Sequence, residues 1–342
     1  MRDGGAAMRF FRILWILCFG AFAGFVSAPA SAQQITWRLT TASPSDDSTV
    51  QSLRDFAAAI EQRTNGRMRI RLFPNSALGN DIKDQVRSGA AEMGELSLAV
   101  YGSESRLFAV DAIPFLARNF AEARTLYQAS RSELRQTLGG QGLMLLFAAP
   151  ADPQGVFSAR AIGSLGDMKG LTWRANDQVT KEFADRIGAS SRSMAFDEAR
   201  QMLARGSNGS VIASPKVGGA AGLARIASHF CATPARIPKT AIVIGKRAFD
   251  VLDAGTQKII LDAAASFEAM AWDARERRYK EDLAAIKEGG MNVSELSSSS
   301  QDDLRTISQR ILKAYCPECI GDGGCTHPKV VCKTDPKLCC DP

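Results

Sequence analysis

Apolar and polar residues alternate with two different periods along this chain, and segments of one period are followed by segments of the other. Short runs such as 35–39 and 68–73 are apolar at every second position, which is typical of a strand with one buried face. The segments between such runs are apolar at every third or fourth position, which is typical of a helix that covers a sheet. The shorter period and short apolar runs predict strands at 35–39, 68–73, 93–100, 143–149, 155–158, 171–174 and 237–244. The longer period predicts helices at 50–64, 80–88, 121–138, 178–187, 196–204, 255–288 and 300–315.

Strands and helices alternate from residue 33 to residue 150, an order that predicts an α/β domain with a mainly parallel sheet. A second block of the same kind begins near residue 151, and a further strand and the long helix follow it. The chain then crosses between the blocks more than once. We therefore predict a two-lobe α/β fold with a cleft between the lobes and the long helix bridging them. The predicted lobes are 33–150 plus about 239–278 for lobe I, and 151–238 plus about 279–315 for lobe II.

The first 32 residues have the composition of an export signal. Arg9 and Arg12 precede an apolar run at 13–26, and Ala30-Ser31-Ala32 offers a cleavage site. The run is shorter than the roughly twenty residues that a membrane-spanning helix needs. We predict a cleaved signal peptide at 1–32 and a mature protein in the periplasm.

The chain carries 42 basic and 36 acidic residues, and its formal charge of +6 is spread along the whole length. This diffuse excess favours small anions as ligands and disfavours nucleic acid, which needs a clustered basic face. The sequence has two histidines and no motif of the hydrolases, zinc peptidases or nucleotide-binding enzymes. The glycine-rich segment 218–222 lacks the context of a dinucleotide site, so we interpret it as a loop. We predict a binding protein that is no enzyme and uses no cofactor.

Cysteine sets the segment 316–342 apart from the rest of the chain. Cys231 is the single cysteine between the export signal and residue 315, whereas six lie within 316–342. In an exported protein such a cluster predicts disulfides. Thiol and imidazole groups at this spacing also suit a soft metal such as zinc, and these ligands are Cys316, Cys319, Cys325 and His327. We predict a disulfide-stapled appendage, with a metal site as the alternative.

Five segments, in the right order, resemble motifs of the solute receptors of TRAP (tripartite ATP-independent periplasmic) transporters, the DctP-type family. They are 56–66 with its Thr-Asn-Gly end, 75–93 with Ala-Leu-Gly and Arg-Ser-Gly-Ala, 113–123 with Ile-Pro-Phe-Leu, 164–174 with Gly-Asp-Met-Lys-Gly-Leu-Thr-Trp-Arg, and 196–206. The resemblance extends from about residue 33 to 315. It implies a periplasmic-binding-protein-like fold and a receptor that delivers a small organic acid to TRAP membrane permease subunits. We expect a monomer that binds no nucleic acid.

The same resemblance implies site residues. Arg174 ends the fourth motif and takes the place of the arginine that pairs with the ligand carboxylate, and a guanidinium fork suits a carboxylate. Asn176 is a candidate second contact. Asn208 stands in a segment where the family usually has an acidic residue, and Gln154 stands near a position where some members have another arginine. Both departures disfavour a four-carbon dicarboxylate and leave a monocarboxylate, an oxo acid or an aromatic acid.

Three more candidates follow from position along the chain. Ser43 follows the first strand, and Asn80 begins a helix whose free N–H groups favour an anion. Tyr101 follows a predicted strand and offers a ring to a ligand. Two other functions stay open: the ligand-binding module of a sensory system, and a secreted metal-handling protein that acts through its cysteine-rich tail.

Overall fold

The computed structural model describes residues 34–76, 80–206 and 208–316. Their first sheet has five strands in the order β2-β1-β3-β10-β4. Its strands are β1 (Ile35–Thr40), β2 (Met68–Phe73), β3 (Met93–Ser97), β4 (Leu143–Pro150) and β10 (Lys239–Gly245). The helices around it are α1 (Ser48–Arg63), α2 (Asn80–Ser88), α3 (Phe120–Gly140), α7 (Lys246–Asp250) and the first part of α8 (Ala254–Glu288).

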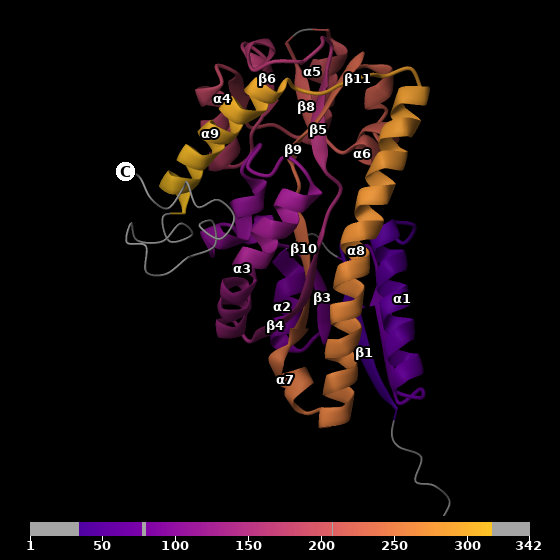
Figure 1. Ribbon diagram of the computed structural model, residues 1–342. Coiled ribbons are helices and arrows are strands. Elements are labelled where there is room, and N and C mark those ends of the chain that lie inside the picture. Colours follow the sequence, from indigo (N-terminus) through magenta and orange to yellow (C-terminus); the bar gives the residue numbers. More distant parts are fainter. Residues whose placement is uncertain (1–33, 77–79, 207, 317–342) are drawn as a thin grey trace, which may run out of the picture.

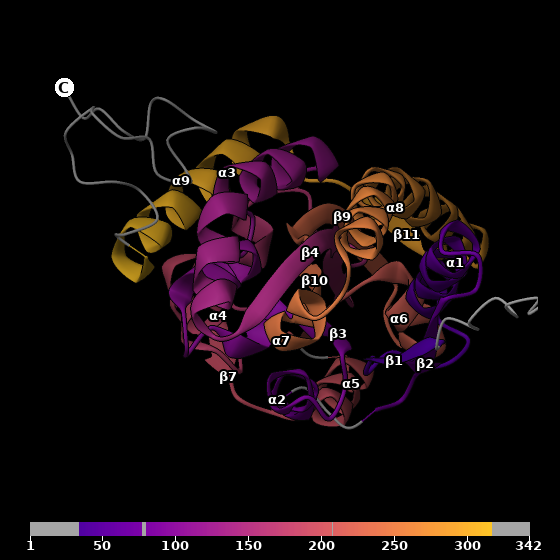
Figure 2. The same cartoon turned by 90° about the horizontal axis from the view of Figure 1, so that it is seen from below.

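The first sheet is covered on both faces, as Figure 2 shows from below. Helices α1 and α8 pack on one face around Phe56, Phe147 and Ile260, and helices α2 and α3 pack on the other. Strands β1, β2 and β3 pair in parallel, but β10 is antiparallel to both β3 and β4. The predicted mainly parallel sheet is therefore wrong in part, because the strand that returns late in the chain inserts between β3 and β4 in the opposite direction.

The second sheet has four strands in the order β11-β9-β5-β8, and a separate pair, β6-β7, lies beside it. These strands are β5 (Gln154–Ser158), β6 (Thr172–Arg174), β7 (Ser190–Arg192), β8 (Ser210–Ala213), β9 (His229–Arg236) and β11 (Asn292–Ser294). The helices with them are α4 (Gln178–Arg186), α5 (Phe196–Ala204), α6 (Pro215–Ala220) and α9 (Ser298–Tyr315). Short 3-10 helices lie at Leu98–Tyr101, Arg106–Ala112, Gly166–Met168 and Leu223–Arg225.

The chain passes between the two sheets three times (Figure 1). Residues 151–153 connect β4 to β5, residues 237–238 connect β9 to β10, and α8 runs along both sheets. On the first sheet, the indole Nε1 of Trp272 donates a hydrogen bond to the carbonyl of Ala148 in β4, at 3.1 Å. On the second, the hydroxyl of Tyr279 donates to the carbonyl of Ala232 in β9, at 3.0 Å. We call the region of the connections 151–153 and 237–238 the junction.

Side-chain caps begin several helices where the sequence has an aspartate. The carboxylates of Asp47, Asp177 and Asp253 accept a backbone N–H in the first turn of α1, α4 and α8. Helix α1 gives way to Asn65 and Gly66 in left-handed conformations, with φ of 51° and 75°. Because these local signals are strong, the predicted positions of α1, α4 and α8 agree with the structure to within a few residues.

Several elements differ from the sequence prediction, among them α6 and β9. Segment 218–222, predicted as a loop, contains the end of α6, which Ser214 caps and Pro215 starts. Gly218 lies so close to β5 that a Cβ atom there would come within 2.1 Å of the Phe157 ring. Strand β9 was not predicted, because five of its eight residues are buried and four of these are consecutive, which hides a period of two.

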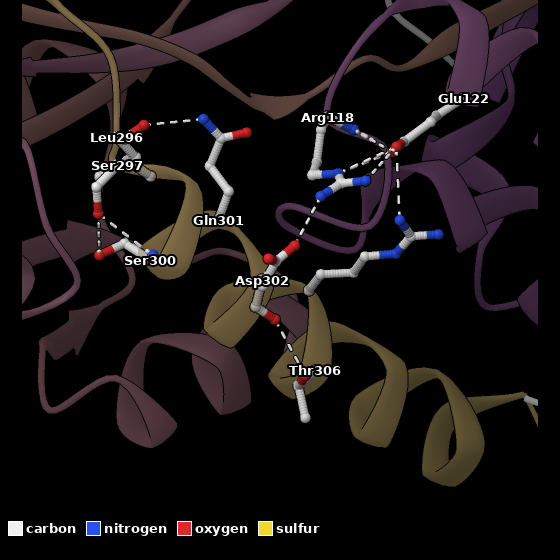
Figure 3. Close-up of polar contacts among 9 residues, drawn as sticks. Arg118, Glu122, Leu296, Ser297, Ser300, Gln301, Asp302 and Thr306 are labelled. Carbon is white, nitrogen blue, oxygen red and sulfur yellow. Dashed lines mark hydrogen bonds and ion pairs between the residues drawn. The ribbon is translucent and has the colours of Figure 1, made fainter. Parts of the chain in front are cut away.

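Helix α9 is held against the start of α3 by a network of charges (Figure 3). The guanidinium of Arg118 binds Glu122 at 2.7 Å and Asp302 of α9 at 2.9 Å. Arg305, also on α9, lies 3.5 Å from the same Glu122 carboxylate. This network connects a helix that packs beside the second sheet to a helix of the first sheet. No helix among the described residues is long and apolar enough to cross a membrane.

Candidate ligand-binding site

Strand ends from both sheets meet at the junction. Strand β5 begins there with Gln154, β9 ends there with Arg236, and β10 begins there with Lys239. Strand β6 ends with Arg174. Ligand sites are preferred at the interfaces between lobes, so the polar side chains of these four residues form the candidate site.

Arg174 is half-buried and fixed at one edge of its guanidinium. Its Nε donates a hydrogen bond to the carbonyl oxygen of Met194, at 2.9 Å. The two terminal nitrogens have no hydrogen-bond partner within 34–76, 80–206 and 208–316. The side chain is therefore oriented by the protein, and the outer edge of its planar guanidinium makes no hydrogen bond to the described residues. Strand β6 is itself held in place, since its Thr172 N–H donates to the carbonyl of Asn208 at 2.7 Å.

Asn176 contacts the same segment as Arg174. Its amide nitrogen donates to the carbonyl of Met194 at 3.2 Å, and its amide oxygen accepts from the Met194 N–H at 3.1 Å. The hydroxyl of Ser193 also donates to that oxygen, at 3.3 Å. In this structure the Asn176 amide therefore orders the segment that orients Arg174, and its predicted contact with a ligand stays a prediction.

Arg236, like Lys239, is a residue of the candidate site that the sequence reasoning missed. It is the partner of Gln154 in the pairing of β9 with β5. Its side chain is 19% exposed, and its nearest carboxylate is that of Asp177, with 3.9 Å between Nη1 and Oδ2. Its Nε is buried without a hydrogen-bond partner, and so is the amide oxygen of Gln154. Two buried polar atoms without partners at one place are unusual in a folded protein.

Charge around Arg236 is only partly compensated. Burial lowers the pKa of its guanidinium, Asp177 raises it, the positive charge of Arg174 lowers it further, and Asp111 raises it. Asp111 already forms a buried ion pair with Lys239, at 3.0 Å, and accepts the Lys239 backbone N–H at 2.7 Å. The carboxylate of Asp177 also caps α4. The site therefore has an excess of positive charge.

A second polar group lies at the end of β1. The carboxylate of Glu95 in β3 accepts hydrogen bonds from the hydroxyls of Thr41 and, at 3.3 Å, Ser43. Burial raises the pKa of Glu95, and the hydrogen bonds from Thr41 and Ser43 only partly oppose this effect. The Ser43 hydroxyl that was predicted to contact a ligand is thus engaged with Glu95.

The other predicted site residues lie in different surroundings. Tyr101 is 4% exposed and packs in the core, where the ammonium of Lys83 lies 4.7 Å from the centre of its ring. The ring that we expected to face a ligand therefore faces the protein interior. Asn208 is exposed and supports β6 through its backbone. Asn80 is the first residue of α2, and its side chain lies outside what the structure describes.

No group of three or more possible metal ligands occurs among the described residues. The predicted export signal and most of the cysteine-rich tail, including Cys319, Cys325 and His327, lie outside those residues. Cys316 is buried at the end of α9. The disulfide and metal hypotheses for the tail, and the sensory alternative, stay predictions.

Residues 39–318 match the family of bacterial extracellular solute-binding proteins, family 7, known as DctP. This chain belongs to the DctP family. Among curated proteins it is similar to the 2,3-diketo-L-gulonate-binding periplasmic protein YiaO of Escherichia coli K12, with 28% identity over 196 residues. That match spans 56% of this chain and 59% of YiaO, which is less than two thirds of the relative.

Two solved DctP structures from Bordetella pertussis cover nearly all of the described chain. DctP7 is 28% identical with a TM-score of 0.71, over 83% of this chain and 95% of its own. DctP6 is 28% identical with a TM-score of 0.73, over 89% and 98%. Both are extracytoplasmic solute receptors that bind pyroglutamic acid. The predicted two-lobe α/β fold and the resemblance to TRAP receptors are confirmed, and the chain is a solute-binding receptor, not an enzyme.

Proposed function

We propose that this chain is the periplasmic receptor of a TRAP transporter and that it captures a small organic acid through the carboxylate. The observation that carries the proposal is Arg174, which the carbonyl of Met194 orients while its terminal nitrogens stay available for a ligand. A guanidinium held in this way offers two parallel N–H donors to the two oxygens of a carboxylate. The receptor would deliver the acid to TRAP permease subunits as a monomer, after removal of 1–32.

Relatives of known ligand support a ligand with one carboxylate. DctP6 and DctP7 bind pyroglutamic acid, and YiaO is named for 2,3-diketo-L-gulonate. Each of these acids has a single carboxylate and is otherwise uncharged. The site of this chain is compatible with such acids because its uncompensated charge is positive and small.

A ligand that contacts both sheets would change how the two lobes are arranged, and a permease could recognise that change. Glu95 lies in β3 of the first sheet and Ser43 shortly follows β1, whereas Arg174 and Gln154 lie on the side of the second sheet. A ligand shifts the balance between two arrangements of the lobes only if it contacts one arrangement better than the other. Contacts from both sides of the junction provide that difference, and the connections 151–153 and 237–238 are short enough to act as hinges.

The test is binding of L-pyroglutamate and other small acids to the purified chain, measured by calorimetry and by thermal unfolding. A ligand at about 100 times its Kd stabilises the chain by about 2.7 kcal/mol, which raises the melting temperature by a few degrees. Arg174→Lys keeps the charge but loses the fork, so we expect it to weaken binding about tenfold or more. Arg186→Ala is the matched control, because Arg186 is an exposed arginine of the same lobe that pairs with Glu182. Failure of every small carboxylate to bind the folded wild-type chain would contradict the proposal.

A further inference from the structure

Arg174 and Arg236, which we call the basic pair, come from different strands, and the positive charge of Arg174 acts on Arg236. Arg174 ends β6 and Arg236 ends β9, and Asp177, three residues after Arg174, lies 3.9 Å from the Arg236 guanidinium. Like charges repel most strongly where burial excludes water. An anion that binds near both groups relieves this repulsion.

The charge of the surroundings indicates how much negative charge a ligand must bring. The Lys239–Asp111 ion pair is neutral overall. The basic pair brings two positive charges, and Asp177 brings one negative charge at 3.9 Å from Arg236. Among the charges that act on Arg236, together with the Lys239 that pairs with Asp111, one positive charge is left. A ligand with one carboxylate neutralises it, whereas a dicarboxylate leaves a buried charge without a counterion, which is unfavourable.

Gln154 adds a requirement for a hydrogen-bond donor. Its amide oxygen is buried and has no partner, although it lies opposite Arg236 in the strand pairing. A buried acceptor without a donor costs free energy in the empty site, and a ligand that supplies an N–H or O–H recovers it. A ligand without such a group leaves the oxygen unsatisfied, and this is how protein sites reject analogues that lack a single polar group.

We propose that Arg236 and Gln154 determine the specificity of this receptor: Arg236 shares the ligand's single carboxylate with Arg174, and Gln154 accepts a hydrogen bond from an N–H or O–H of the same ligand. The ligand class is thus a small monocarboxylic acid with a donor group near the carboxylate, such as a hydroxy acid or a lactam acid. This assignment rests on the proposed function, because it concerns the same site. Some members of the family have an arginine near the position of Gln154. In this chain Arg236, on the neighbouring strand β9, would supply that guanidinium instead.

The experiment compares three probes of similar size on the full chain by calorimetry. L-pyroglutamate has one carboxylate and a donor, cyclopentanecarboxylate has one carboxylate and no donor, and glutarate has two carboxylates. We expect the wild type to bind L-pyroglutamate about 10- to 100-fold more tightly than cyclopentanecarboxylate, which is the effect of one buried hydrogen-bond group. Glutarate binds more weakly than L-pyroglutamate.

Two variants separate the roles of the residues. Arg236→Met removes the charge and keeps the length, so it weakens both monocarboxylates about 10- to 100-fold. Gln154→Leu weakens L-pyroglutamate alone and brings it level with cyclopentanecarboxylate. Arg186→Met leaves all three affinities unchanged. The melting temperature of the ligand-free Arg236→Met chain is not lowered, because a poorly compensated buried charge has been removed, and this readout separates a ligand contact from a structural role.

The outcomes distinguish this inference from the proposed function. Loss of binding in Arg174→Lys together with unchanged binding in Arg236→Met overturns the second guanidinium and leaves the proposed function intact. A wild type that prefers glutarate, or that binds the two monocarboxylates equally, overturns the ligand class. A wild type that binds none of the three probes overturns the inference. The proposed function then stands only if another small carboxylate binds through Arg174.

Discussion

Phe115, in the Ile-Pro-Phe-Leu motif, has a backbone φ of 58°, a conformation that is rare for a large side chain. Its ring is buried and stacks on Phe183 of α4 at 5.5 Å between ring centres, and Trp173 of β6 lies at 6.5 Å. The backbone N–H of Phe115 donates to the carbonyl of Ala235 in β9, at 2.8 Å. These contacts fix the residues that precede Arg174 and Arg236, so the motif supports the site without touching it.

We expect Phe115→Ala to lower the free energy of unfolding by about 3–5 kcal/mol, because it removes a fully buried ring and leaves a cavity. The measurement is urea unfolding followed by fluorescence. Phe73→Ala is the control, since that ring is 43% exposed at the end of β2 and its loss should change the free energy by about 0.5 kcal/mol or less. Equal effects of the two substitutions would refute the supporting role of Phe115.

Site residues were predictable only where a motif marked them. Arg174 ends a recognisable segment, and the structure places it at the candidate site. Arg236 follows no motif, and only the pairing of β9 with β5 brings it to Gln154. Tyr101 was predicted from its position after a strand, but β3 ends at Ser97 and a 3-10 turn carries the ring into the core. The surroundings of Arg236 and Tyr101 depend on pairing and packing with distant parts of the chain, which no local sequence pattern encodes.

At the scale of elements, the packing of α6 on β5 depends on one glycine. Gly218 faces Phe157, whereas a Cβ atom at Gly219 would meet nothing within 4 Å. We expect Gly218→Ala to destabilise the protein by about 1–3 kcal/mol through overpacking. We expect Gly219→Ala to stabilise it by up to about 1 kcal/mol, because alanine restricts the unfolded chain and favours a helix. Thermal unfolding of both variants is the measurement, and shifts of the same sign would contradict this interpretation.

The contact between α9 and α3 makes stability depend on pH. Burial tends to raise the pKa of Glu122, but hydrogen bonds from Arg118 and the charge of Arg305 outweigh it and hold the pKa below its usual value. A carboxylate with a lowered pKa stabilises the fold above the pKa of the unfolded chain, and this contribution is lost as pH falls through the folded pKa. The loss therefore occurs in the acid range, below about pH 4.3.

We expect Glu122→Gln to be less stable than the wild type at pH 7 and to approach it at pH 3, as measured by urea unfolding at both pH values. Glu61→Gln is the matched control, because Glu61 forms an exposed ion pair with Arg69 at 2.7 Å, which contributes little. A difference between wild type and Glu122→Gln that stays the same from pH 7 to pH 3 would exclude the charge network as its cause.

Elements with strong local signals were predicted well, and those defined by partners were not. Helices α5 and α8 begin and end within a residue of their predicted bounds. Strand β10 begins at Lys239, two residues later than predicted, because 237–238 belongs to the junction. Strand β9 has four consecutive buried residues and no exposed one, so its neighbours on both sides define it.

At the scale of the whole molecule, the two sheets are parts of one folding unit. Three passages of the chain connect them, and the aromatic cluster of Phe115, Trp173 and Phe183 belongs to a core that continues from the first sheet to α9. Ion pairs also cross from one part to the other: Lys216 of α6 binds Asp47 at the start of α1, at 2.7 Å. Residues 34–150 do not contain every strand of the first sheet, because β10 follows β9 in the chain.

Helix α8 limits where residues can be inserted or deleted in this receptor during evolution. Its 35 residues form a rod about 52 Å long, with Trp272 anchored to one sheet and Tyr279 to the other. These two anchors are seven residues apart, close to two full turns, so both face the same side. One extra residue between them would rotate the second anchor by about 100° away from β9. We therefore expect insertions and deletions in the surface loops. Within α8, the number of residues between Trp272 and Tyr279 can change only by a number that makes whole helical turns.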